Sequence, residues 1–112
     1  MVNKKEAVLD NAFGALSSPV RRAMLSRLSQ GEATVSELAS AHEISLPGIS
    51  KHVRVLENAG LIRREKRGRE YHCRIKPAPM REAVAWLAQH QHFWEQQFDA
   101  LDNFLAEGGA DD

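Results

Sequence analysis

Residues 34–60, TVSELASAHEISLPGISKHVRVLENAG, carry two short amphipathic helix patterns that follow one another closely. The first opens at Thr34 with a glutamate three residues later, a capping box in which each side chain satisfies an unpaired backbone N–H group. The second opens at Ser45, whose hydroxyl can cap the next helix. Helices over 35–42 and 46–59, joined by three or four residues, have the spacing of a helix-turn-helix, although the usual turn glycine is absent.

Two more helices are expected before this segment. Apolar residues recur at one-, three- and four-residue steps up to Leu16, which is typical of an amphipathic helix within residues 1–16. Ser18 followed by Pro19 marks the start of the second helix, because serine caps well and proline suits the first helical turn. We expect Gly31 to end this helix. Its predicted inward-facing residues are Val20, Ala23, Met24 and Leu28.

The residues after the helix-turn-helix change to a strand-like pattern. Residues 61–75 contain two runs of strand-forming residues, the second of which alternates between apolar and polar side chains. Arg67-Gly68-Arg69 lies between the two runs and predicts a tight turn. A hairpin beside a helix-turn-helix is called a wing. The expected fold is therefore mainly α-helical with a two-stranded β-wing, that is, a winged helix-turn-helix.

A long helix is expected after the wing. Pro77 and Pro79 are predicted to end the hairpin, and the helical period then continues without a break over residues 80–106. Such a helix is about 40 Å long at ~1.5 Å per residue. Residues 107–112 are expected to form a flexible acidic tail.

Length and composition limit the class of protein. A chain of 112 residues can bury one core but not two, so residues 1–112 are expected to form one domain, with the helix-turn-helix at 35–59. No apolar run approaches the ~18 residues of a membrane helix, and the start lacks a secretory signal, so we expect a cytoplasmic protein without membrane contact. Cys73 is the only cysteine, which excludes an internal disulfide and a multi-cysteine zinc site.

The formal net charge of zero conceals a strong separation of charge along the chain. Residues 19–81 hold 13 lysines and arginines against 6 acidic residues, whereas residues 82–112 hold 7 acidic residues and no lysine or arginine. A basic block joined to an acidic block indicates that one surface, and not the other, meets a polyanion.

The second helix of the helix-turn-helix offers a polar face for DNA. If Ile49, Val53 and Leu56 face the core, the side chains opposite them can meet phosphates and base edges in a major groove. The helix start also favours a phosphate through its free N–H groups. Two positions stay open: Gly48 either allows close approach to DNA or is a tolerated first-turn residue, and His52 either packs on the domain or contacts DNA. The candidate DNA-binding residues here are Ser45, Pro47, Gly48, Ser50, Lys51, His52 and Arg54.

The wing carries five cations within seven residues, which repel one another unless a polyanion is near. We expect the arginines at the tip of the hairpin to reach the backbone or the narrower minor groove of flanking DNA. The alternative is a solvated basic edge strand that resists aggregation. The candidate DNA-binding residues of the wing are Arg64, Lys66, Arg67 and Arg69.

Two adjacent apolar stripes run along residues 80–106, and they hold five of the seven aromatic residues of the chain. One stripe can cover the small core, but the second would be exposed in a monomer, so a second subunit is expected to cover it. Residues 1–16 are expected to join residues 80–106 in this interface. The alternative, a long helix folded back on itself, needs a break that the sequence lacks. The expected dimer contacts are Phe13, Trp86, His90, Phe93, Trp94, Gln97, Phe98, Leu101, Phe104 and Leu105.

Catalysis, cofactors and metal binding find little support in the sequence. No nucleophile elbow, paired carboxylates, phosphate-cradling loop or HExxH motif is present, so we expect no enzyme activity and no cofactor. His90 and His92 point about 160° apart around a helix, so they cannot hold one metal ion together. We assign no metal ligands.

The segment 13–75 resembles the winged-helix transcriptional regulators of the ArsR type, the ArsR/SmtB superfamily. The most specific parts are LSSPVRR at 16–22 and SKHVRVLENAGL at 50–61. The resemblance implies a homodimer whose terminal helices pair and whose recognition helices enter successive major grooves of a pseudo-palindromic operator. It also implies repression of transcription until an inducer releases the DNA.

The metal-binding motifs familiar in this family are missing. Thr34 and Ser36 stand where one motif has two cysteines. The motif of the last helix would place a ligand pair at Pro79 and Arg81, neither of which can bind zinc as required.

Together these features predict a sequence-specific DNA-binding regulator that acts as a homodimeric repressor on double-stranded operator DNA. Its inducer, small molecule or metal, is not specified by the sequence. Two alternatives stay open. One is a metal-responsive repressor with atypical ligands across the dimer, such as His90, His92, Glu95 or Asp99. The other is a winged-helix protein-interaction module that does not bind DNA.

Overall fold

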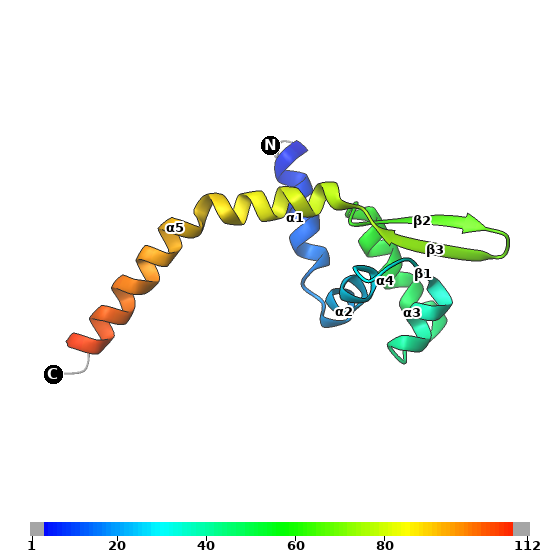
Figure 1. Cartoon of the computed structure of the whole chain (residues 1–112), viewed down its shortest axis with the longest axis horizontal. Coiled ribbons are helices and arrows are strands. Elements are labelled where there is room, and N and C mark those ends of the chain that lie inside the picture. Colours follow the sequence, from blue (N-terminus) through cyan, green and yellow to red (C-terminus); the bar gives the residue numbers. More distant parts are fainter. Residues whose placement is uncertain (1–3, 109–112) are drawn as a thin grey trace.

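The computed structural model describes residues 4–108 (Figure 1). This part of the chain folds as a winged helix-turn-helix, which confirms the predicted fold class. In chain order, its elements are α1 (Lys4–Ala15), α2 (Pro19–Leu28), β1 (Ala33–Thr34), α3 (Val35–Ala41), α4 (Leu46–Asn58), β2 (Ile62–Arg67), β3 (Glu70–Ile75) and α5 (Pro77–Glu107).

The helix starts lie where the capping residues place them. The Ser18 hydroxyl accepts a hydrogen bond from the third residue of α2, and the Ser45 hydroxyl accepts one from Gly48 N at 3.2 Å. The capping box of α3 is complete, because Thr34 N donates to Glu37 Oε1 at 2.8 Å and Glu37 N donates to Thr34 Oγ1 at 3.0 Å. The capping residues therefore set where α2, α3 and α4 begin.

The wing is part of a three-stranded antiparallel sheet with the order β1-β3-β2. The two long strands form the predicted hairpin, and Gly68 takes a positive φ of 64° in its turn. The added strand, β1, pairs Ala33 with Cys73 and ties the hairpin to the start of α3. Two residues are too short to show a strand period, so the sequence did not reveal this strand.

One hydrophobic core lies among the first four helices and the base of the sheet, with Met24, Leu38, Ile49 and Leu56 fully buried. The predicted inward face of α2 is partly wrong. Ala23 is exposed, and Leu25 is buried instead, so the buried stripe of α2 lies further round the helix than predicted.

The last helix, α5, is longer than predicted. It begins at Pro77 rather than residue 80, because a proline in the first turn loses no helical hydrogen bond. It continues to Glu107, the first residue of the predicted tail, while residues 109–112 lie outside the described part of the chain. Figure 1 shows α5 crossing α1 and then running out from the body without folding back. Ala83 is the only residue of α5 that is buried.

Candidate nucleic-acid interface

The helix α4 separates an inner apolar face from an outer polar one, as predicted. Ile49, Val53 and Leu56 are buried, whereas Lys51 and Arg54 are exposed. Ser45 and Pro47 are exposed at the start of the helix, and Ser50 is half-buried. Leu46, the first residue of α4, is also 52% exposed, and the sequence did not single it out as part of this surface. Its position directly after the Ser45 cap could have indicated that it is exposed.

Gly48 has a structural reason within the chain. A Cβ atom at this position would lie 3.0 Å from Ile44 Cγ2 and 3.1 Å from Ser45 Oγ, so any side chain would press on the residue before the helix and on the cap. Packing inside the domain therefore explains why position 48 is a glycine. A close approach of Gly48 to DNA stays a prediction.

His52 points toward the body of the domain and meets Arg21 of α2. The Arg21 Nη1 atom lies 3.2 Å from His52 Nδ1, while Arg21 Nε donates to Ala15 O at 2.7 Å at the end of α1. Burial, and then the positive charge of Arg21, hold the pKa of His52 below its usual value of 6.5. The His52 ring therefore packs against Arg21 of the same domain, and a contact of His52 with DNA stays a prediction. Arg21 was missed as a positioning residue, since its partners lie far away in the sequence.

The two faces of the wing carry different sets of cations. Residues paired across an antiparallel ladder share a face, and the register pairs Lys66 with Tyr71 and Arg64 with Cys73. The guanidinium of Arg64 lies 4.7 Å from the centre of the Tyr71 ring, and the Lys66 ammonium lies 5.8 Å from it. Arg64 also lies 3.5 Å from Glu57 near the end of α4. This face of the wing therefore contacts the end of the candidate recognition helix.

Arg67 faces the other way and is held by carboxylates of its own chain. Its two terminal nitrogens donate to the two Glu32 oxygens at 2.9 and 2.7 Å, and its Nε donates to Glu65 at 3.1 Å. The Arg67 hydrogen bonds lower the pKa of Glu32, and these carboxylates raise the pKa of Arg67. Arg69, at the turn, is exposed and has no hydrogen bond or ion pair within residues 4–108. Arg67 and Arg69 looked equivalent in sequence, but in the fold only Arg69 is free to contact DNA without first breaking an ion pair.

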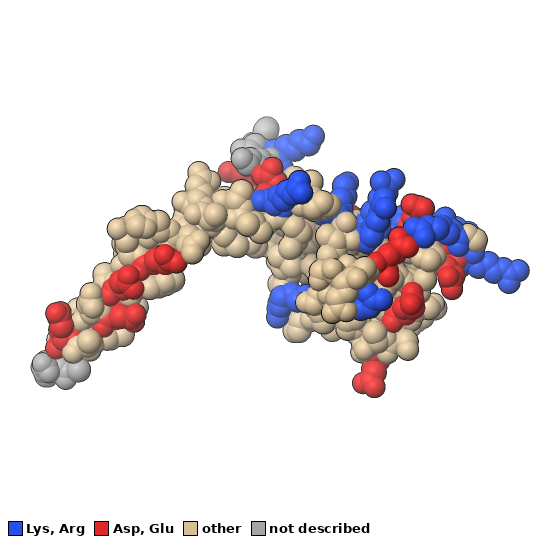
Figure 2. All heavy atoms as spheres, in the orientation of Figure 1, with Lys and Arg blue, Asp and Glu red and all other residues tan. Residues whose placement is uncertain are grey.

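Charge is separated in space as it is in sequence. Figure 2 shows lysines and arginines over the body and the wing, and acidic residues alone along the far part of α5. Some acidic residues also lie near the wing, where Glu32, Glu57 and Glu65 pair with arginines.

The helix α5 presents an apolar face that one chain does not cover. Trp86 packs edge-on against Phe13 of α1 at 6.1 Å between ring centres, and the His90 and Trp94 rings continue this row along the helix. His90 Nδ1 also lies 2.9 Å from Trp86 O. The remaining predicted interface residues are all exposed; they are Phe93, Gln97, Phe98, Leu101, Phe104 and Leu105. This exposed row continues the stripe that begins at Phe13 and Trp86.

Other candidate sites are not assembled in the part of the chain that the structure describes. Within residues 4–108, no three His, Cys, Asp or Glu side chains lie together in a way that could hold a metal ion. Thr34, at the position of a family thiolate, serves instead as the cap of α3. Burial raises the pKa of the Cys73 thiol to about 11, which suits a core residue rather than a nucleophile. None of the helices described has the length and apolar character needed to cross a membrane.

The chain is similar to known regulators over most of its length. A family model described as a helix-turn-helix domain matches residues 16–65. The transcriptional repressor SdpR of Bacillus subtilis is 29% identical over 79 residues, which cover 70% of this chain and 88% of SdpR. A solved structure described as the ArsR family transcriptional regulator RHA00566 is 46% identical, covers 85% of this chain and 97% of its own, and superposes with a TM-score of 0.74.

The chain belongs to the ArsR family of transcriptional regulators. A further solved neighbour, the fragment 1–100 of Mb0332 from Mycobacterium bovis, is described as the homodimeric winged helix-turn-helix DNA-binding domain of a possible ArsR-family transcriptional regulator. It is 26% identical, covers 83% of this chain and 91% of its own, and has a TM-score of 0.61. In other curated relatives, the matched segment covers about half of the relative's length.

Proposed function

We propose that this ArsR-family regulator is a homodimeric repressor that binds a pseudo-palindromic operator, with α4 of each copy in a major groove. The observation that carries the proposal is the joint between α4 and the wing. Arg64 reaches from β2 to Glu57 of α4, so the polar face of α4 and the basic hairpin are held as one surface. A major groove is wide enough for one helix, and a wing at its side can reach the flanking backbone.

Different residues of this surface have different roles in the proposal. Lys51 and Arg54 are exposed on α4 and are suited to phosphates and to base edges, respectively. Arg69, at the wing tip, has no partner in the described part of the chain and is suited to a phosphate or to the minor groove. Arg67 has first to leave Glu32 before it can serve DNA, so we give it the role of holding the wing in place.

The second copy is proposed to cover the apolar face of α5. Phe98, Leu101 and Phe104 are each more than half exposed, and contiguous apolar surface of this kind marks an interaction site. The homodimeric description of the Mb0332 fragment supports a self-association of this type. A dimer also sets the spacing of two α4 helices, which a two-fold symmetric operator requires. The protein is proposed to act on DNA in the cytoplasm.

The test is a comparison of two arginine variants on two DNAs. An operator is first selected by the full chain from a random duplex pool, and a scrambled duplex of the same composition serves as reference. Arg54→Ala is expected to weaken operator binding by about 1–3 kcal/mol per recognition contact while leaving the scrambled duplex nearly unchanged. Arg69→Ala is expected to weaken both duplexes by the same factor, since phosphates carry no sequence.

Lys4→Ala provides the control, because it removes an exposed cation from the first turn of α1, outside α4 and the wing. It is expected to keep wild-type affinity for both duplexes. Unchanged operator affinity in Arg54→Ala and Arg69→Ala, or no operator recovered from the pool, would reject the proposed interface.

A further inference from the structure

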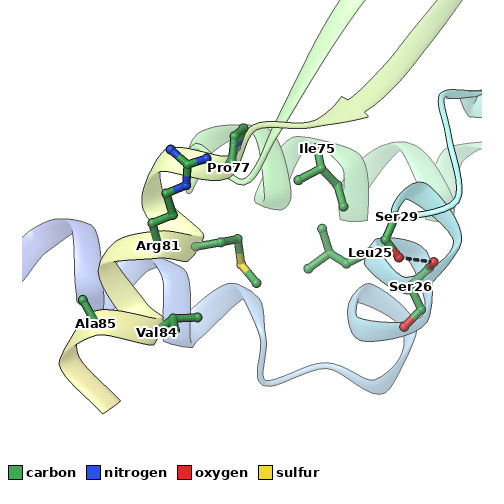
Figure 3. A pocket seen from close by; sticks show the side chains of 9 residues that line it. Leu25, Ser26, Ser29, Ile75, Pro77, Arg81, Val84 and Ala85 are labelled. Carbon is green, nitrogen blue, oxygen red and sulfur yellow. Dashed lines mark hydrogen bonds between the residues drawn. The ribbon is translucent and has the colours of Figure 1, made fainter. Parts of the chain in front are cut away.

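A groove of about 560 Å³ lies between α2, the end of β3 and the first turns of α5. Figure 3 shows Leu25 from α2, Ile75 from β3 and Val84 from α5 around the same space. Met80 also lines it. Its volume falls within the ~300–1,000 Å³ of small-molecule sites, and its wall is mostly apolar, as in such sites.

A small number of polar groups stand on this apolar wall. The Arg81 side chain lies at the edge of the groove, on the first turns of α5 (Figure 3). It is exposed and makes no hydrogen bond or ion pair with any residue from 4 to 108. On α2, Ser26 and Ser29 line the groove, and the Ser29 hydroxyl donates to Ser26 O at 2.6 Å. The groove thus combines an apolar wall with one free cation.

We propose that the groove binds an apolar organic anion, a carboxylate of medium chain length, and that this molecule is the effector of the regulator. The hydrocarbon chain would cover Leu25, Met80 and Val84, where burial of apolar surface stabilises binding. The carboxylate would meet the Arg81 guanidinium, whose planar fork matches a carboxylate. The effector role rests on the proposed DNA-binding function, whereas the binding site does not.

The position of the groove explains how a bound molecule acts on DNA binding. One wall, α2, belongs to the body, where Arg21 of α2 contacts His52 of α4. The other wall belongs to α5, which carries the exposed face proposed for the second copy. A molecule that contacts both walls favours one angle between α5 and the body, and therefore one distance between the two α4 helices of a dimer. A ligand changes DNA affinity when it prefers one such arrangement over the other.

The binding test uses octanoate and octanol on the full chain without DNA. The two probes share a chain length and differ in charge, and titrations followed by ¹H–¹⁵N NMR locate the site and give each affinity. Octanoate is expected to shift the amide signals of Ser26, Val84 and Ala85. Arg81→Gln is expected to weaken octanoate binding about threefold to fivefold, the upper part of the range for an exposed ion pair, and to leave octanol binding unchanged.

A filled groove gives the second arm of the test. Ala85→Trp places an indole in the groove and is expected to abolish octanoate binding. Ala106→Trp adds the same side chain at the far end of α5, more than five turns from the residues that line the groove, and is expected to bind octanoate like the wild type. If Ala85→Trp fails to fold by circular dichroism, the octanoate and octanol affinities of Arg81→Gln decide the question.

The results that overturn the site are specific. The site is contradicted if octanoate does not bind, if it binds Ala85→Trp as well as Ala106→Trp, or if Arg81→Gln leaves its affinity unchanged. The site is also overturned if the second copy of the chain fills the groove. In that case Ala85→Trp would be a monomer, and octanoate would not bind the wild type.

The effector role has its own readout, the affinity for the selected operator with and without saturating octanoate. A change of about fivefold or more, the lower end of allosteric couplings, is expected in the wild type and not in Ala85→Trp. Octanoate that binds in the groove and leaves operator affinity unchanged overturns the effector role. Absence of DNA binding without octanoate would instead count against the proposed function, so the two failures are distinguishable.

Discussion

Replacing Arg21 with alanine removes the side chain that connects α1, α2 and α4. Its Nε donates to Ala15 O at 2.7 Å, its Nη1 lies 3.2 Å from His52 Nδ1, and its Nη2 donates to Gly14 O at 3.4 Å. Two of these partners are carbonyls at the end of α1, where helical carbonyls lack intrahelical partners. Their loss therefore loosens α1 and the recognition helix together.

The size of the effect follows from these contacts. A hydrogen bond from a charged group contributes about 1.5–3 kcal/mol, and partial exposure places the short Ala15 bond at the lower end of that range. The two longer contacts add less, so Arg21→Ala should lower the free energy of unfolding by about 2 kcal/mol. For a small domain this is a fall in melting temperature of roughly 10 °C. Removing the Arg21 charge should also raise the pKa of His52, while burial still holds it below its usual value.

The assay is urea unfolding followed by circular dichroism at one protomer concentration, because dimerisation adds to apparent stability. Arg22→Ala is the matched control. The adjacent side chain makes one exposed hydrogen bond to Leu16 O at 2.6 Å, so its loss should cost about 1 kcal/mol or less. Arg21→Lys keeps the charge but not the planar fork, and an intermediate loss is expected. Equal losses in Arg21→Ala and Arg22→Ala would refute the positioning role.

Three further predictions concern the helix face, the histidine and the thiol. Phe98→Glu places a charge on the exposed apolar face and should convert dimer to monomer by light scattering, whereas Asp99→Asn should remain dimeric; a monomeric wild type would contradict the interface. Because the pKa of His52 is lowered on folding, the unfolded chain binds the proton first, so stability should fall as pH drops below about 6.5. His52→Gln should reduce this fall, and an unchanged pH profile would count against it. The raised pKa of Cys73 predicts no alkylation by iodoacetamide at neutral pH in the folded chain and rapid reaction in denaturant, so rapid reaction of the folded chain would disagree.

The parts of the fold that sequence predicts well are those set by neighbours in the chain. The Thr34 capping box acts over three residues, and Ser18 and Ser45 cap the helices that they precede, so these starts can be read locally. The outward face of α4 can also be predicted locally, because the helical period and the positions of the buried residues together determine which side chains face outward. The unbroken period of α5 likewise predicted that it would not fold back.

The parts that sequence did not reveal depend on contacts between distant residues. Arg67 meets Glu32 across 35 positions and Arg21 meets His52 across 31, and no local pattern encodes either pair. The wing arginines therefore looked alike in sequence, although the fold pairs Arg64 with Glu57 and Arg67 with Glu32 and leaves Arg69 without a partner among residues 4–108. The strand β1 was missed for the same reason, since its pairing with β3 defines it.

The most direct test of the central claim, that α4 and the wing form one DNA-binding surface in each copy of a dimer, is the salt dependence of operator affinity. With about seven phosphates neutralised per dimer, the plot of log affinity against log salt should have a slope of about −6. Arg69→Ala should make this slope shallower by about 2, one for each copy. An affinity that hardly changes from low to moderate salt, or a slope that Arg69→Ala leaves untouched, would contradict the account.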